Sequence, residues 1–111
     1  MWLEAVRAAE EKQARHVRVL DLRDVTSFAD YFVILSGANT RQIQAIADEV
    51  HHRLKKLGEM PASMEGYDNA EWILMDYGDF LVHIFTPEKR GFYDLERLWS
   101  NAPRTAVSEA A

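Results

Sequence analysis

Residues 72–85 read WILMDYGDFLVHIF, two apolar runs separated by Gly78-Asp79. A glycine at the first position of a two-residue connection is typical of a tight β-hairpin turn. We therefore predict two antiparallel strands, over 72–77 and 80–85. Side chains alternate between the two faces of a sheet. In the first strand, one face therefore has Trp72, Leu74 and Asp76, and the other has Ile73, Met75 and Tyr77. In the second strand, one face has Phe80, Val82 and Ile84, and the other has Leu81, His83 and Phe85.

Two strands and two helices are predicted upstream of this hairpin. Residues 31–36 (YFVILS) are a continuous aromatic and β-branched run, which predicts a central strand covered on both faces. Residues 16–22 (HVRVLDL) alternate and predict another strand. Apolar residues recur every three or four positions over 40–57, which predicts an amphipathic helix. Residues 2–14 predict a first helix.

One further helix is predicted downstream of the hairpin. Pro87 ends the second hairpin strand, because proline cannot donate a hydrogen bond to the sheet. Gly91 precedes a short helix predicted over 92–99, and residues 61–70 are predicted as a polar loop. The order α-β-β-α-β-β-α predicts an α/β (α+β mixed) fold with helices packed on a mixed sheet. We expect one domain over 1–103 and a frayed tail over 104–111.

Composition limits the classes of function. The chain has 111 residues, no cysteine and a formal net charge of −5. Absence of cysteine excludes disulfides and thiolate metal sites and agrees with a reducing, cytoplasmic location. We expect no membrane segment and no signal peptide, because no apolar run is long enough for either. Negative charge disfavours direct binding of nucleic acid, whose phosphates require a basic surface, and favours a basic protein partner.

Candidate catalytic residues are few. His51 and His52 are adjacent in the predicted helix, so they point in different directions and cannot form an i, i+4 metal pair. Asp76 and Asp79 flank the hairpin turn and could bind magnesium, although hydrogen bonds within the turn also explain Asp79. Gly37 precedes the long helix as in a phosphate-binding turn, yet any turn into a helix needs such a residue. A magnesium-dependent nucleotidyltransferase therefore stays open as one alternative.

Large aromatic residues occur on both faces of the hairpin and in the last predicted helix: Trp72, Tyr77, Tyr93 and Trp99. Helices on both faces of the sheet would bury them. Helices on one face alone would leave an exposed apolar patch with an acidic rim, which is typical of a protein-binding surface. If that patch bound a second copy of the chain, the protein would be a homodimeric adaptor, which is a second alternative.

The hairpin also belongs to a longer recognisable pattern. Residues 65–85 (EGYDNAEWILMDYGDFLVHIF) resemble the signature of the ribosomal silencing factor family, RsfS, also called the Iojap family. That signature is E-G, a few polar residues, then W-I-h-h-D-h-G-D-h-h-V-H-h-h, with h for apolar. Residues 90–99 (RGFYDLERLW) resemble the family ending R-x-x-Y-x-L-E-x-L-W. With further matches upstream, the resemblance covers about 2–99.

The resemblance implies a function without catalysis, metal or cofactor. Family members are anti-association factors that bind the large ribosomal subunit through its fourteenth ribosomal protein. Occupying that site blocks joining of the small subunit and lowers translation when nutrients run short. The family fold is similar to a nucleotidyltransferase core without the catalytic motif, and a shared fold does not establish activity.

The resemblance and the alternation pattern together give the expected partner contacts, which are Trp72, Asp76, Tyr77 and Tyr93. Trp72 and the tyrosines are expected to supply buried anchor area, and Asp76 to meet a basic side chain. Alternation places Tyr77 on the face opposite Trp72, so Tyr77 could reach a flat partner only over the strand end.

Three more residues match family positions: Glu65, Asp79 and His83. We expect them to support the hairpin and its neighbouring loop. For His83, which lies inside an apolar strand, a structural histidine is the expected role.

Overall fold

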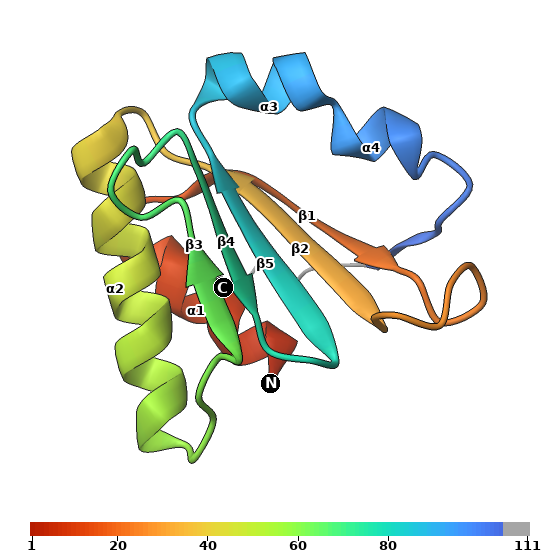
Figure 1. The fold of residues 1–111 in the computed structure, drawn as a ribbon, viewed down its shortest axis with the longest axis horizontal. Coiled ribbons are helices and arrows are strands. Elements are labelled where there is room, and N and C mark those ends of the chain that lie inside the picture. Colours follow the sequence, from red (N-terminus) through yellow and green to blue (C-terminus); the bar gives the residue numbers. More distant parts are fainter. Residues whose placement is uncertain (106–111) are drawn as a thin grey trace.

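Six strands form one mixed sheet in the order β3-β4-β5-β2-β1-β6 (Figure 1). This is a computed structural model, and it describes residues 1–105. β2 and β5 pair in parallel, and every other neighbouring pair is antiparallel. The elements are α1 (Trp2–Glu11), β1 (Arg15–Asp21), β2 (Tyr31–Ser36), α2 (Thr40–Lys56), β3 (Ser63–Glu65), β4 (Trp72–Asp76), β5 (Phe80–Phe85), α3 (Pro87–Tyr93), α4 (Leu95–Leu98) and β6 (Arg104–Thr105).

Helices α1 and α2 cover one face of the sheet. The apolar positions of α2 recur at helical spacing, and five of them are buried against the strands: Ile43, Ile46, Ala47, Val50 and Leu54. The strands contribute the alternate residues that point to this side, including Ile73, Met75, Val82 and Ile84. The larger hydrophobic core therefore lies between this face and the two helices.

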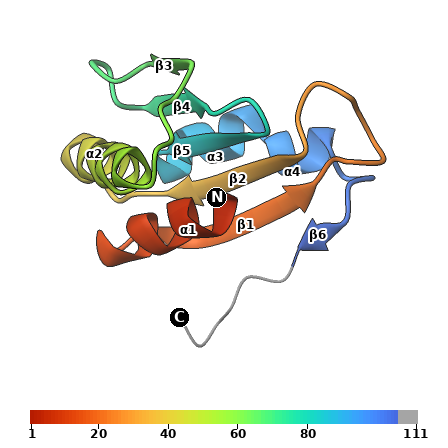
Figure 2. The same ribbon diagram turned by 90° about the horizontal axis from the view of Figure 1, so that it is seen from below.

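The opposite face carries a smaller core. Leu20, Phe32, Ile34 and Phe85 are buried there, with Leu95 and Trp99 packed against them. Figure 1 shows α3 and α4 following one another across the end of the sheet at which β5 finishes. In Figure 2, α1 lies in front of the strands and α3 and α4 lie behind them. Cover on this second face is partial, and that leaves room for a surface site.

The central predictions are confirmed. The fold is a mixed α/β sheet, β2 spans the predicted 31–36, and α2 spans 40–56. The hairpin forms with Asp76 paired to Leu81, and Gly78 in its turn has φ +87°. Ile73 and Met75 are buried in the larger core. Trp72, Leu74 and Asp76 alternate with them in β4, as predicted, and are half-buried.

The predicted single helix over 92–99 is wrong. The chain becomes helical at Pro87, where the hydroxyl of Thr86 accepts a hydrogen bond from the Lys89 N–H at 3.3 Å. Proline suits the first helical position because its missing N–H would have no partner there. Asp94, in the left-handed conformation with φ +49°, then separates α3 from α4.

Two short strands were not predicted. β3 lies within the segment predicted as a polar loop and pairs with β4, with Glu65 opposite Leu74. β6 pairs with β1, with Arg104 opposite Leu20. The frayed tail predicted from 104 is therefore wrong for residues 104 and 105, and the rest of it lies outside the described residues.

Candidate functional site

Exposed apolar side chains gather where α3 and α4 meet the partly covered face of the sheet. Phe92 is 75% exposed, Leu98 70% and Tyr93 44%. Phe92, Tyr93 and Leu98 line one open hollow. Tyr93 also borders a hollow that contains Trp72, and Trp72 shares a third with Leu74. These side chains are linked through the hollows that they share, and we call them the apolar strip: Leu74, Trp72, Tyr93, Phe92 and Leu98.

Trp72 is the fixed centre of the strip. Its ring stacks on Phe85 at a centroid distance of 5.0 Å and contacts Tyr93 at 4.6 Å. Its indole N–H donates a hydrogen bond to Nδ1 of His83 at 3.2 Å. Because its only polar atom is paired inside the protein, the half-buried ring presents apolar surface outward.

His83 supports Trp72 through this hydrogen bond. Its side chain is buried among rings, and its centroid is 4.6 Å from that of Phe32. Burial lowers the pKa of His83 to about 4, so the imidazole is neutral at physiological pH. The neutral ring accepts the indole N–H at Nδ1 and carries its own proton on Nε2, which has no partner among the described residues. Its hydrogen bond to Trp72 joins β5 to β4, and the supporting role expected for His83 in the hairpin stays a prediction.

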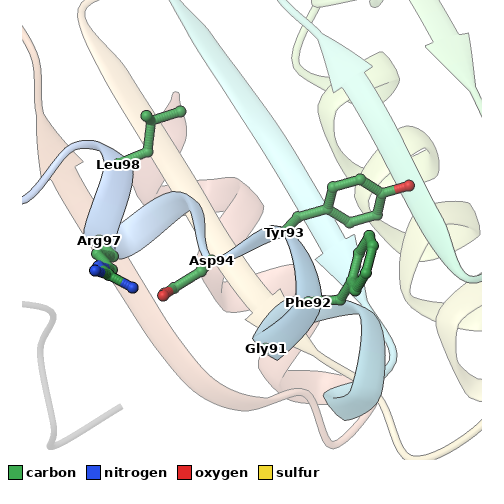
Figure 3. A pocket seen from close by; sticks show the side chains of 6 residues that line it. All are labelled: Gly91, Phe92, Tyr93, Asp94, Arg97 and Leu98. Atoms are coloured by element: carbon green, nitrogen blue, oxygen red, sulfur yellow. The ribbon is translucent and has the colours of Figure 1, made fainter.

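The two short helices bring the exposed part of the strip into place (Figure 3). The rings of Phe92 and Tyr93 lie next to each other, with their centroids 5.1 Å apart. Arg97 and Asp94 extend to another side of α4 than Leu98. The break at Asp94 lets Leu95 and Trp99 pack inward while Phe92 and Leu98 stay at the surface.

The acidic residues singled out from the sequence lie at two places. Glu65 ends β3, is exposed, and lines a hollow with Trp72 and Leu74. Asp76 ends β4, and its Oδ1 accepts a hydrogen bond from the Gly78 N–H at 2.8 Å. Asp79 is exposed in the turn. Glu65 thus borders the apolar strip, whereas Asp76 and Asp79 belong to the hairpin turn.

Tyr77 lies on the other side of the sheet from the strip. It packs against the larger core and stacks on Phe80 at 5.0 Å. Its hydroxyl is buried without a hydrogen-bond partner among the described residues. Burial, followed by the nearby charge of Glu59, raises the pKa of Tyr77 to about 12. The structure therefore brings Trp72 and Tyr93 together and separates Tyr77 from both.

The nucleotidyltransferase alternative gains no support from this geometry. Gly37 follows Ser36, which pairs with Phe85, whereas the hairpin turn precedes Phe80, which pairs with Tyr31. The glycine turn and the aspartates thus lie at opposite ends of two six-residue strands, about 17–20 Å apart. The Ala38 N–H in this turn already donates a hydrogen bond to Oε1 of the Gln42 side chain at 2.5 Å, so it is not free to bind a phosphate. Residues 1–105 contain no group of three or more histidine, aspartate or glutamate side chains placed to hold a metal.

Several residues of the site were not predicted. Phe92 and Leu98 were not expected at the surface, because a single helix over 92–99 would have put Leu98 on its inner face. Leu74 was predicted on the Trp72 face but not as part of a site. Arg90 gives no signal in hydrophobic periodicity.

No helix among the described residues is long and apolar enough to span a bilayer.

Comparison with known proteins identifies the family. The model of the family described as "Ribosomal silencing factor during starvation" matches residues 1–111. Ribosomal silencing factor RsfS of Bacillus subtilis is 40% identical over 99 residues, which cover 89% of this chain and 84% of that protein.

Two further similarities extend this result. A crystal structure of a Bacillus halodurans protein superimposes with a TM-score of 0.84 at 36% identity, covering 96% of this chain and 95% of that one. The mouse protein named "Mitochondrial assembly of ribosomal large subunit protein 1" is 32% identical over 93 residues, 81% of this chain and 41% of its own. From the family match and the identity over most of the chain, the protein belongs to the ribosomal silencing factor family.

Proposed function

We propose that this protein docks on the large ribosomal subunit through the apolar strip and thereby prevents the small subunit from joining. The direct contact in this proposal is the fourteenth large-subunit ribosomal protein. The observation that carries the proposal is the strip itself, which leaves Phe92 and Leu98 more than two-thirds exposed. Contiguous exposed apolar side chains on a small protein mark interaction sites.

The strip has the composition of a binding hot spot. Large aromatic residues contribute most to binding when they are rigid before the partner arrives, because little conformational entropy is then lost. Trp72 is held by the Phe85 ring and by its hydrogen bond to His83. Tyr93 is packed against Trp72. These two rings form a preorganised centre, and Phe92, Leu74 and Leu98 extend it.

Charge around the strip favours a basic partner. The hollows along the strip are lined by three acidic side chains, Glu65, Glu71 and Asp94, and by two basic ones, Lys89 and Arg97, and the whole chain has a formal charge of −5. Ribosomal proteins are basic as a class, and complementary charge speeds association and excludes wrong partners. Glu65 borders the strip and is exposed. A rim with a small excess of acidic side chains, on a chain that is acidic as a whole, therefore suits a basic ribosomal protein better than bare RNA.

The proposed mechanism is steric competition. A bound factor occupies surface that the small subunit needs, so binding of one excludes the other and no chemical step is required. With free factor at about 100 times its Kd, the blocked large subunit is stabilised by about 2.7 kcal/mol. Translation falls in proportion to the subunits removed from joining. The names of relatives, a ribosomal silencing factor and a large-subunit assembly protein, agree with this proposal.

The test uses purified ribosomal subunits sedimented with the wild type and with two variants. Leu98→Glu places a charge in the strip. Leu57→Glu is the matched control, because Leu57 is also exposed, at 48%, but follows α2 far from the strip in the chain. We expect the wild type and Leu57→Glu to co-sediment with the large subunit and to reduce joined ribosomes, and Leu98→Glu to bind about tenfold more weakly or worse.

Two results would decide against the proposal. If the wild type leaves subunit joining unchanged, silencing by this chain is refuted. If both leucine variants weaken binding equally, the strip is not the contact. Titration of the isolated fourteenth ribosomal protein separates the finer claim, because binding to whole subunits without binding to that protein would show a different direct partner.

A further inference from the structure

Helices α3 and α4 carry the exposed part of the apolar strip but cannot hold their own positions. They span seven and four residues, and neither has a fully buried residue. Helices this short are unstable alone, because nucleation costs more than a few hydrogen bonds return. Asp94, in the left-handed conformation, interrupts the regular backbone between them. Some side-chain contact must therefore fix both helices relative to the sheet.

Arg90 makes the polar contact of this kind, beside the packing of Tyr93 on Trp72 and of Leu95 and Trp99 on the smaller core. Its side chain is 13% exposed and lies between α3, α4 and β2. Nε donates to Oε1 of Glu96 at 2.9 Å, and a terminal nitrogen donates to Oε2 at 3.1 Å. The other terminal nitrogen donates to the hydroxyl of Ser36 at 2.9 Å. One guanidinium thus joins both short helices to the carboxyl end of a central strand.

We infer that Arg90 is a positioning residue that sets how α3 and α4 present Phe92, Tyr93 and Leu98 to the partner. This inference rests on the proposed function, because it concerns the surface that would dock. A guanidinium suits the role, since its planar fork binds a carboxylate through two bonds and still has donors for a hydroxyl. The pKa of Glu96 is lowered, mainly by the hydrogen bonds from Arg90, which keeps the carboxylate charged.

Removing the guanidinium should loosen the helices and spare the sheet. Ser36 is buried, and the strands around it belong to hydrophobic cores that do not include α3. Leu95 and Trp99 still anchor α4 by packing. If the binding-competent arrangement falls to about one tenth of the molecules, the apparent Kd rises about tenfold, since affinity scales with the competent fraction.

The experiment compares Arg90→Gln with Arg53→Gln. Arg53 is the matched control, because it also pairs with a helix carboxylate, that of Glu11, on the α1 and α2 side of the sheet. Amide hydrogen exchange is measured on both full-length variants without any partner. We expect Arg90→Gln to lose about tenfold or more protection over 88–99 while the amides of β2 and β5 keep theirs, and Arg53→Gln to leave 88–99 unchanged.

Exchange results alone can overturn the inference. Unchanged protection over 88–99 in Arg90→Gln would show that the residue positions nothing. Equal loss of protection throughout the sheet would show a general stability residue instead. Glu96→Gln, which leaves the arginine in place but weakens its pairing, should reproduce the local loss to a smaller extent.

Binding to large subunits then tests whether the position of the helices affects docking. We expect Arg90→Gln to bind about tenfold more weakly, and Tyr93→Ala to cost less in the Arg90→Gln background than in the wild type. Additive losses would mean that Arg90 does not act through the strip, which overturns the inference. Absence of binding by the wild type refutes the proposed function and leaves the exchange result standing as a separate outcome.

Discussion

The indole nitrogen of Trp72 lies 3.2 Å from Nδ1 of His83, across the β4–β5 pair that the hairpin turn sets in register. The bond requires a neutral imidazole, since a protonated ring would have no lone pair to accept the indole N–H. Burial of His83 among rings therefore supports the orientation of the most central residue of the apolar strip.

His83 makes stability depend on pH below neutrality. Its pKa is lowered from 6.5 to about 4 by burial. Between these values the unfolded chain binds a proton that the folded chain does not, so stability rises with pH there and is lost as pH falls. The full effect is about 3 kcal/mol. Urea unfolding at steps from pH 7 to pH 4 should show this loss.

His83→Gln is the matched variant for that series, because a glutamine side chain can still accept the indole N–H and does not titrate. Its stability should stay flat between pH 6.5 and 4.5. The pKa of Glu96 is lowered, so the stability that Glu96 contributes is lost only as the pH falls below its ordinary 4.5, and this loss is common to both proteins. An equal slope in the variant would show that another group is responsible.

Glycine is required at position 66 because the backbone there lies close to the backbone of Trp72. Its φ is +82°, and a Cβ built on it would lie 2.1 Å from the Trp72 carbonyl oxygen. Gly66→Ala should destabilise the protein by about 3 kcal/mol or more, because backbone has to move. Gly58→Ala is the control: φ is +88° but nothing lies within 4 Å, so about 1 kcal/mol is expected. Equal midpoints of urea unfolding would contradict the close approach.

Sequence reasoning succeeded where one pattern ran over a whole element. The run at 31–36 and the spacing over 40–56 each determined a strand or a helix without help from distant residues. It failed at the start of α3 because Thr86-Pro87 both ends β5 and begins a helix. The sequence analysis used Pro87 only as the end of a strand, whereas the structure shows Thr86 capping α3. β3 is three residues long and is defined by pairing with β4.

The candidate site was half predictable for the same reason. Alternation places Trp72 and Tyr77 on opposite faces, and the structure agrees. The contact between Trp72 and Tyr93 needs the angle at which α3 returns over the sheet, and the hydrogen bond that ties α3 to β2 joins Arg90 to Ser36, 54 positions apart in the chain. Exposure of Phe92 and Leu98 follows from that angle and is absent from any local pattern.

Tyr77 gives a direct test of which face docks. Tyr77→Phe removes a buried hydroxyl that has no partner among the described residues, so stability should be unchanged or rise by up to about 1 kcal/mol. Because the pKa of Tyr77 is raised to about 12, the wild type should also lose stability as pH rises from 10 to 12, and the variant should lose less. Binding to large subunits should be unaffected. Weaker binding would return Tyr77 to the contact surface, as the sequence had predicted.

Asp76 separates a structural role from a charge contact. Its Oδ1 accepts the Gly78 N–H at 2.8 Å and so shapes the turn. Asp76→Asn keeps an oxygen acceptor and should leave stability nearly unchanged, whereas Asp76→Ala should lose about 1 kcal/mol. If Asp76 serves only the turn, Asp76→Asn binds large subunits as the wild type does. If instead Asp76→Asn folds normally and binds several-fold more weakly, with a smaller dependence on salt, the carboxylate meets a basic side chain of the partner. The docking surface would then extend from the apolar strip along β4 to the hairpin turn.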